Sequence, residues 1–284
     1  MGGAGGANAM IPIQYALRRR MMMAAMASID VSALSITYTG AYTDYGIVTM
    51  SDGARYRLLA FTASGTLSIE QPVNCEVCVV GGGANGSKAT IYESGAGGAG
   101  AYLKNQSVSA YNGGSVVVGA RQGVSSIADV SVNAVSGKNG GTGAGGNTAG
   151  TGDGISKYPF EDTGYSLWAG KPHCAGGGQG VYEYRGDGGY YRGFNGGNGG
   201  TNGGNGYPQA GKEKIEPEGG VGGSYGGGRG GRLYGGAFEG RNATYYGSGA
   251  GGGRYYKYAD GDVRLYTGGS GYQGIVYMRI PVIQ

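Results

Sequence analysis

The sequence has little proline, cysteine or bulky apolar aromatic side chain. Its 284 residues include 7 Pro, 3 Cys, 4 Phe, 1 Trp and 1 His. Collagen needs glycine at every third position together with abundant proline, and neither condition is met. Three cysteines are too few for a disulfide scaffold. No apolar run approaches the roughly 18 residues of a transmembrane helix, so membrane insertion is not expected.

Charge is also scarce. Lys and Arg number 22 and Asp and Glu number 18, which gives a formal net charge of +4. This excess is small and dispersed, so it does not by itself predict nucleic-acid binding. The apolar run after Arg18, Arg19 and Arg20 is too short for a secretory signal peptide, and we expect synthesis in a cytoplasm.

Glycine and tyrosine are abundant instead. The chain contains 69 Gly and 25 Tyr, and 42 of these glycines and 17 of these tyrosines lie beyond residue 150. Glycine has no side chain to bury, which argues against an ordinary enzyme core and against catalysis. Tyrosine combines contact area with a polar tip, and this composition suits a binding surface better than a core.

Short runs of β-branched and aromatic residues predict a mainly β fold. Turn signals at Gly40, Gly46 and Asp52-Gly53 divide the region up to Leu59 into short strands. Further strands are expected over 55–61, 66–69, 75–80, 101–104, 107–109, 115–118 and 127–135. The closing run 274–283 is strongly β-forming and should return to pair with the earlier strands, with Pro281 at an edge or exit position. We expect a framework resembling a β-sandwich of short strands.

Recurring glycine blocks predict an unusual second kind of packing. An extended helix with three residues per turn has no internal hydrogen bonds, so its amides need partners from neighbouring segments. Glycine lets backbones approach closely enough to supply them. We therefore expect a packed section resembling polyglycine II with irregular aromatic loops. The alternative is a flexible low-complexity tail.

These patterns divide the chain into four regions. Residues 1–30 form an N-terminal attachment segment with a short helix over 13–27. Residues 31–60 form a small β region, 61–136 with 268–284 form the sandwich framework, and 137–267 form the glycine-rich section that displays loops. Methionines in the first region suit docking to another subunit, with Ile13, Leu17, Met21 and Met22 as candidates.

Three stretches together resemble the glycine-rich domains of bacteriophage tail fibres and tail-tip adhesins. They are 61–69 (FTASGTLSI) running into 78–83 (CVVGGG), 95–103 (GAGGAGAYL) followed by 111–120 (YNGGSVVVGA), and 268–280 (GGSGYQGIVYMRI). The resemblance covers roughly residues 56–284, and the pieces occur in the family's order. It implies a virion component that displays variable loops from a glycine-packed scaffold and binds a bacterial surface. A homotrimer is one assembly open to such a fibre.

Aromatic residues between the glycine blocks are the candidate receptor contacts. Rigid rings on loops rich in Gly, Ser and Asn resemble antibody combining sites, and rings also stack on sugar faces. We expect about half of them to be structural. The candidates are Tyr158, Trp168, Tyr182, Tyr184, Tyr190, Tyr191, Phe194, Tyr245, Tyr246, Tyr255 and Tyr256.

Other motifs have simpler explanations. Cys75 and Cys78 have the spacing of a metal or redox pair, with His173 and Cys174 as further ligands, but residues three apart in a strand point to opposite faces. We expect buried thiols, no metal and no cofactor. His173 is the only histidine and lies in no catalytic-triad motif.

Three hypotheses for function remain. The preferred one is a non-enzymatic virion adhesin that binds a host glycan or surface protein through its loops and other virion proteins through its N-terminal segment. The second is a purely structural head or collar decoration with the same fold. The third is a nucleic-acid-binding protein of the RGG type, based on residues 225–232 (YGGGRGGR).

Overall fold

The computed structural model describes residues 30–90, 95, 97–98, 100–132, 158–178, 180, 182–185, 191–194, 226–230, 239–257 and 261–282. Among these residues no helix is long and apolar enough to cross a membrane. The expected helix over 13–27 and the four docking candidates Ile13, Leu17, Met21 and Met22 lie outside them.

The fold is mainly β, as the sequence predicted. Its largest element is an eight-stranded sheet, called the framework here, with the order β2-β3-β12-β4-β5-β6-β7 and with β1 paired to β4. Its neighbouring strands are antiparallel. The strands are β1 (Ile36–Tyr38), β2 (Tyr42–Thr49), β3 (Arg55–Phe61), β4 (Gly65–Val80), β5 (Leu103–Val117), β6 (Ser125–Ile127), β7 (Val130–Val132) and β12 (Ile275–Pro281).

The closing strand holds the framework together. β12 pairs with β3 on one side and with β4 on the other, so the chain returns to its earlier strands as the sequence predicted. Six of its seven residues are buried, because both of its faces are covered. Pro281 ends the strand opposite Tyr56, at the exit position expected for a residue without an N–H.

Two strands are longer than the sequence indicated. The predicted strands 66–69 and 75–80 belong to the single strand β4, and the three predicted over 101–118 belong to β5. Irregular pairing between β4 and β5, near Val73, absorbs the residues that resembled breaks. Gly46 does not end a strand either, because it lies inside β2 at a similar irregularity with a φ of 66°.

Two apolar cores lie on opposite faces of the framework. One contains side chains such as Leu59, Phe61, Val77 and Met278. The other contains side chains such as Leu58, Cys78 and Tyr277 together with Trp168 from the segment 158–178. The strands β1 to β3 share this sheet with β4, β5 and β12, so the region 31–60 is not a separate unit.

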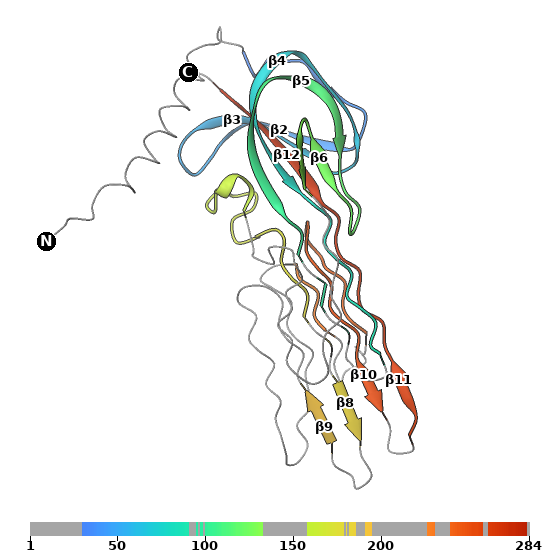
Figure 1. The fold of residues 1–284 in the computed structure, drawn as a ribbon. Coiled ribbons are helices and arrows are strands. Elements are labelled where there is room, and N and C mark those ends of the chain that lie inside the picture. Colours follow the sequence, from blue (N-terminus) through green and yellow to red (C-terminus); the bar gives the residue numbers. More distant parts are fainter. Residues whose placement is uncertain are drawn as a thin grey trace, which may run out of the picture.

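A second, smaller sheet lies at the other end of the molecule (Figure 1). Its order is β11-β10-β8-β9, with β8 (Tyr182–Arg185), β9 (Tyr191–Phe194), β10 (Tyr255–Lys257) and β11 (Val263–Leu265). β10 runs parallel to β8 and antiparallel to β11. Figure 1 shows extended segments running side by side between this distal sheet and the framework.

Candidate binding surface

The extended segments form a bundle around one central segment, residues 247–253. Described residues of six other segments exchange backbone hydrogen bonds with it, and these segments, called the ring here, lie within 81–89, 95–101, 174–180, 226–230, 239–244 and 266–273. Neighbouring ring segments also bond to one another. Gly178 N–H, for example, donates to the Gly228 carbonyl at 2.8 Å. Backbone hydrogen bonds thus connect parts of the chain that are distant in sequence.

The hydrogen bonds recur every third residue. The N–H groups of Gly95, Gly98 and Ala101 donate to the carbonyls of Gly253, Ala250 and Gly247. Likewise Gly249 and Gly252 donate to Ala175 and Gly178. A repeat of three is that of an extended helix with three residues per turn, whose amides point outward to neighbours.

Glycine is required by the spacing of the segments. A Cβ on Gly251 would lie closer than 3.0 Å to the Arg229 carbonyl, and a Cβ on Gly177 would do the same at Ala250. In both cases the obstacle is backbone, which cannot rotate away as a side chain can. Close backbone contact between these segments therefore depends on the missing side chains.

The polarity of these bonds fixes the two ends of the bundle. Residues 81–89 follow β4 away from the framework, and the central segment runs parallel to them because Ala250 and Gly253 donate to Ala84 and Ser87. The chain therefore reaches the distal end at Arg254 and returns along 266–273 to β12. The hairpin of β10 and β11 lies at that end, next to β8 and β9.

Four of the candidate receptor residues are in the distal sheet. Tyr182 and Tyr184 belong to β8, and Tyr191 and Phe194 belong to β9. The backbone register places Tyr182 opposite Phe194. Tyr190 lies outside the described residues. The structure thus brings sequence-distant aromatic positions to one sheet at the distal end.

Three other candidates are buried and are corrected here. Trp168 has no exposed surface, and Tyr255 and Tyr256 are 2% and 5% exposed. Trp168 donates its indole N–H to the Asp162 carbonyl and packs edge-on against Tyr277. These rings hold the structure together and are unavailable to a receptor. The expectation that some aromatics are structural is thereby met at named positions.

The remaining candidates are half-buried near the framework. Tyr158 packs against the second core. Tyr245 and Tyr246 form a tilted ring pair with centroids 5.3 Å apart, and both contact the imidazole of His173. These three residues therefore lie far along the chain's path from the distal sheet.

His173 is a structural residue in a dry environment. Its side chain is fully buried, and its Nε2 lies 3.0 Å from the hydroxyl of Tyr277. Burial lowers the pKa of His173 from its ordinary 6.5 to about 3 and raises the pKa of Tyr277 well above 10. Both groups are neutral at pH 7, and this pair offers no general base.

The cysteines behave as the strand geometry predicts. Cys75 contributes to one core and Cys78 to the other, so the two thiols lie on opposite faces of β4. All three cysteines are free and buried, and burial raises the pKa of Cys75 and of Cys78 to about 12. The part of the chain that the structure describes holds no cluster of three or more potential metal ligands.

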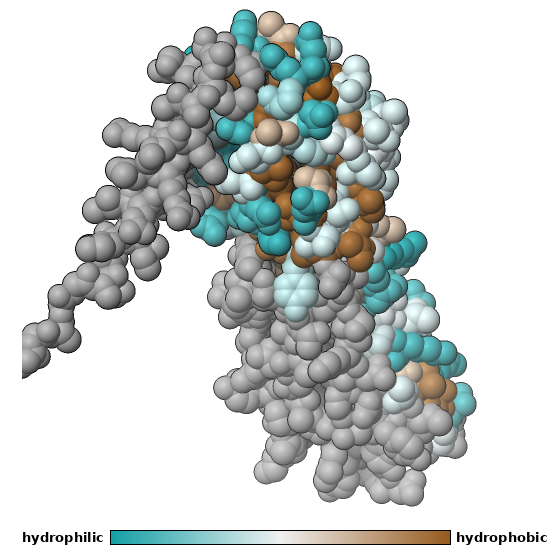
Figure 2. Space-filling view, turned by 45° about the horizontal axis from the view of Figure 1, so that its top comes forward, coloured by the Kyte–Doolittle hydropathy of each residue, from teal (hydrophilic) through white to brown (hydrophobic). Residues whose placement is uncertain are grey.

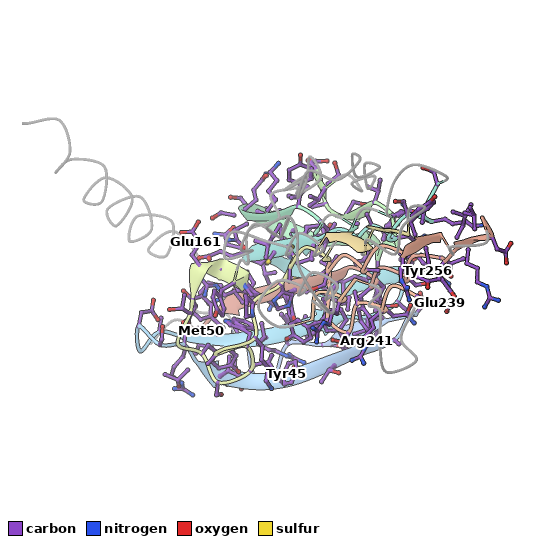
Figure 3. All side chains as sticks on the ribbon, turned by 90° about the horizontal axis from the view of Figure 1, so that it is seen from below. Tyr45, Met50, Glu161, Glu239, Arg241 and Tyr256 are labelled. Carbon is purple, nitrogen blue, oxygen red and sulfur yellow. The ribbon has the colours of Figure 1, made fainter. Side chains whose placement is uncertain are left out.

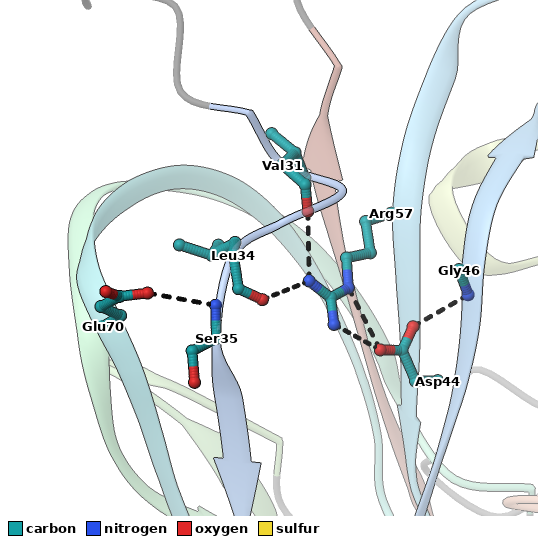
Figure 4. A network of polar contacts seen from close by, with 7 residues as sticks. All are labelled: Val31, Leu34, Ser35, Asp44, Gly46, Arg57 and Glu70. Carbon is teal, nitrogen blue, oxygen red and sulfur yellow. Dashed lines mark hydrogen bonds and ion pairs between the residues drawn. The ribbon is translucent and has the colours of Figure 1, made fainter.

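The described chain begins at a well-anchored position. The Arg57 guanidinium donates to the carbonyls of Val31 and Leu34 at 3.1 and 2.6 Å, and it pairs with Asp44 at 2.7 Å (Figure 4). These contacts fix the segment just before β1 to the edge of β3.

Sequence reasoning missed three surface tyrosines. Tyr45 of β2 and Tyr272 of the ring are 40% and 36% exposed, and Tyr165 is half-exposed. They lie outside the glycine-block loops in which candidates were sought. No periodic pattern marks them, because their proximity arises only from the folded bundle.

No protein-family model matches the chain, and no curated protein matches it either.

Proposed function

We propose that the chain is a non-enzymatic bacteriophage virion protein, a tail-fibre or tail-tip adhesin that binds the bacterial surface at the distal end of its bundle. The proposal rests on the resemblance of its three glycine-rich stretches to such proteins. The observation that supports it most is the arrangement of the bundle, which holds β8 to β11 at the end opposite the framework (Figure 1).

Rigidity is what such a display needs. A contact residue held by an ordered scaffold loses little conformational entropy when it binds, so more of the interaction energy appears as affinity. The ring and central segment provide that order through backbone hydrogen bonds at both ends of each distal connection. In this proposal the candidate contacts are Tyr182, Tyr184, Tyr190, Tyr191 and Phe194.

The framework is then the end that faces the virion. Its edge carries the segment that Arg57 anchors, and the N-terminal region 1–30 continues from there. We propose that this region docks to other virion proteins.

Adsorption to cells tests the proposal. The purified full chain, labelled with a fluorophore, is mixed with a panel of Gram-negative and Gram-positive strains and measured by flow cytometry. We expect saturable binding to a subset of strains. A triple variant with Tyr190→Ala, Tyr191→Ala and Phe194→Ala should lose that binding while keeping its melting temperature.

The matched control is Val124→Ala, an exposed apolar side chain of the framework end. It should bind cells like the parent protein. Absence of binding to every strain, with the chain found in purified virions, would favour the purely structural decoration. Steeply salt-dependent binding to nucleic acid would instead favour the RGG hypothesis.

A further inference from the structure

Four tyrosines from four separate parts of the chain meet where the bundle joins the framework. They are Tyr45 of β2, Tyr165 of the segment 158–178, Tyr246 before the central segment and Tyr272 of the ring. Tyr45 and Tyr272 are 40% and 36% exposed, and the other two are half-buried. We call these four side chains the junction cluster. Figure 3 shows Tyr45 on the β2 side of the molecule.

The rings of the junction cluster are held by other rings. Tyr246 and Tyr272 meet edge-on with centroids 5.6 Å apart, and the imidazole of His173 lies nearly parallel to Tyr246 at 6.1 Å. Tyr165 packs edge-on against the fully buried Trp168 at 4.8 Å. Each half-buried ring therefore rests on a buried neighbour, and its orientation is fixed before any ligand arrives.

The phenol groups also lie near one another. Burial raises the pKa of Tyr246, and the neighbouring phenols of Tyr272 and Tyr45 raise it further. Burial likewise raises the pKa of Tyr165, with further contributions from Tyr45 and the carboxylate of Asp162. The phenols are protonated at neutral pH, and each can donate and accept a hydrogen bond.

This chemistry selects among ligand classes. A charged ligand would need an opposite charge, but the groups that act on Tyr246 are themselves neutral phenols. A purely apolar partner would leave the phenol hydroxyls without hydrogen bonds when it covered them. A neutral sugar ring has an apolar C–H face and a rim of hydroxyls, which match an aromatic face and a phenol. The surrounding framework surface mixes apolar and hydrophilic side chains (Figure 2).

We infer that the junction cluster is a binding site for a neutral oligosaccharide, with Tyr45 and Tyr272 as its exposed stacking faces. This site lies at the framework end and is separate from the distal contacts of the proposed function. The inference therefore holds or fails independently of host adsorption.

Direct binding to the purified full chain tests the inference. Maltohexaose and chitohexaose are the probes, and polygalacturonate is the charged comparison. Saturation-transfer NMR and a titration should show binding of at least one neutral probe and none of polygalacturonate. A double variant with Tyr45→Ala and Tyr272→Ala should weaken binding about tenfold or more, as expected for two lost ring contacts.

Two further variants separate the roles of ring and hydroxyl. Tyr45→Phe with Tyr272→Phe keeps the rings and should lose less affinity than the alanine pair, whereas Val124→Ala should have no effect. Failure of both neutral probes to bind would overturn the inference. So would self-association of the parent chain in sedimentation velocity that the alanine pair abolishes, because a second copy would then occupy the cluster. The distal triple variant should bind the sugar normally, which keeps the two sites distinguishable.

Discussion

The guanidinium of Arg279 lies over the ring of Phe160, with its Cζ 4.3 Å from the ring centroid. The same group lies 4.3 Å from the ring of Tyr56 and forms a 2.6 Å ion pair with Glu76. A residue of the closing strand therefore joins the segment 158–178 to three strands of the framework.

Replacing Arg279 should destabilise the protein. Arg279→Ala leaves the carboxylate of Glu76 without its partner and removes both ring contacts, so we expect a loss of about 3 kcal/mol in the free energy of unfolding. Arg279→Lys keeps the charge but not the planar group, and it should lose less. Urea denaturation measures both. A loss below about 1 kcal/mol for the alanine variant would show that these contacts contribute little.

A side chain in the central segment should be far more costly. Gly251→Ala places a Cβ against the Arg229 carbonyl, and we expect a loss of more than about 3 kcal/mol or failure to fold. Gly170→Ala is the matched control, because its φ of 70° strains an alanine while its Cβ would contact nothing. The control should lose only about 1 to 2 kcal/mol. Similar melting temperatures for the two variants would contradict close packing of the bundle.

Acid should weaken the fold through His173. The folded-state pKa is about 3 against an ordinary 6.5, so between these values the unfolded chain binds a proton that the folded chain excludes. Stability is therefore full above pH 6.5 and falls as the pH drops toward 3. From pH 7.5 to 4.5 we expect a loss of about 2 to 3 kcal/mol from this residue.

The variant His173→Gln isolates that contribution. Glutamine retains polar groups for Tyr277 but does not titrate, so its loss of stability between pH 7.5 and 4.5 should be smaller by that amount. Urea unfolding at the two pH values provides the comparison. Equal pH dependence in parent and variant would show that His173 is not the titrating group.

The three thiols should be inert until the protein unfolds. Burial and, for Cys75 and Cys78, a pKa of about 12 leave almost no thiolate at pH 8. An aromatic disulfide reagent should react with none of the thiols in native protein and with all 3 cysteines in guanidinium chloride. Rapid reaction of one native thiol would locate a region that opens.

Local sequence patterns were sufficient for much of the framework. The strand 55–61 was predicted with its observed bounds, because seven residues without glycine or proline lie between clear turn signals. Pro72 and Gly113 suggested breaks that β4 and β5 do not have, since the irregular pairing of the two strands accommodates them. Pairing between distant strands can override such local signals.

The neighbours within the bundle could not be predicted in this way. A glycine segment carries no side-chain pattern, so the sequence does not distinguish residues 226–230 from 239–244 as a partner for 174–178. Backbone hydrogen bonds select those partners only when the whole ring is assembled. The junction cluster was missed for the same reason, because Tyr45 and Tyr272 become neighbours of Tyr246 only through that assembly.

Adjacent ring segments meet at the distal end in a way that bears on how such a protein diversifies. Arg241 N–H donates to the Arg229 carbonyl, so the segments ending at Gly230 and beginning at Glu239 are already fastened to each other without help from the chain between them. Insertion, deletion or recombination between those two positions leaves every hydrogen bond of the bundle in place. The architecture therefore separates a part of the gene that must be preserved from a part that is free to vary in both length and composition.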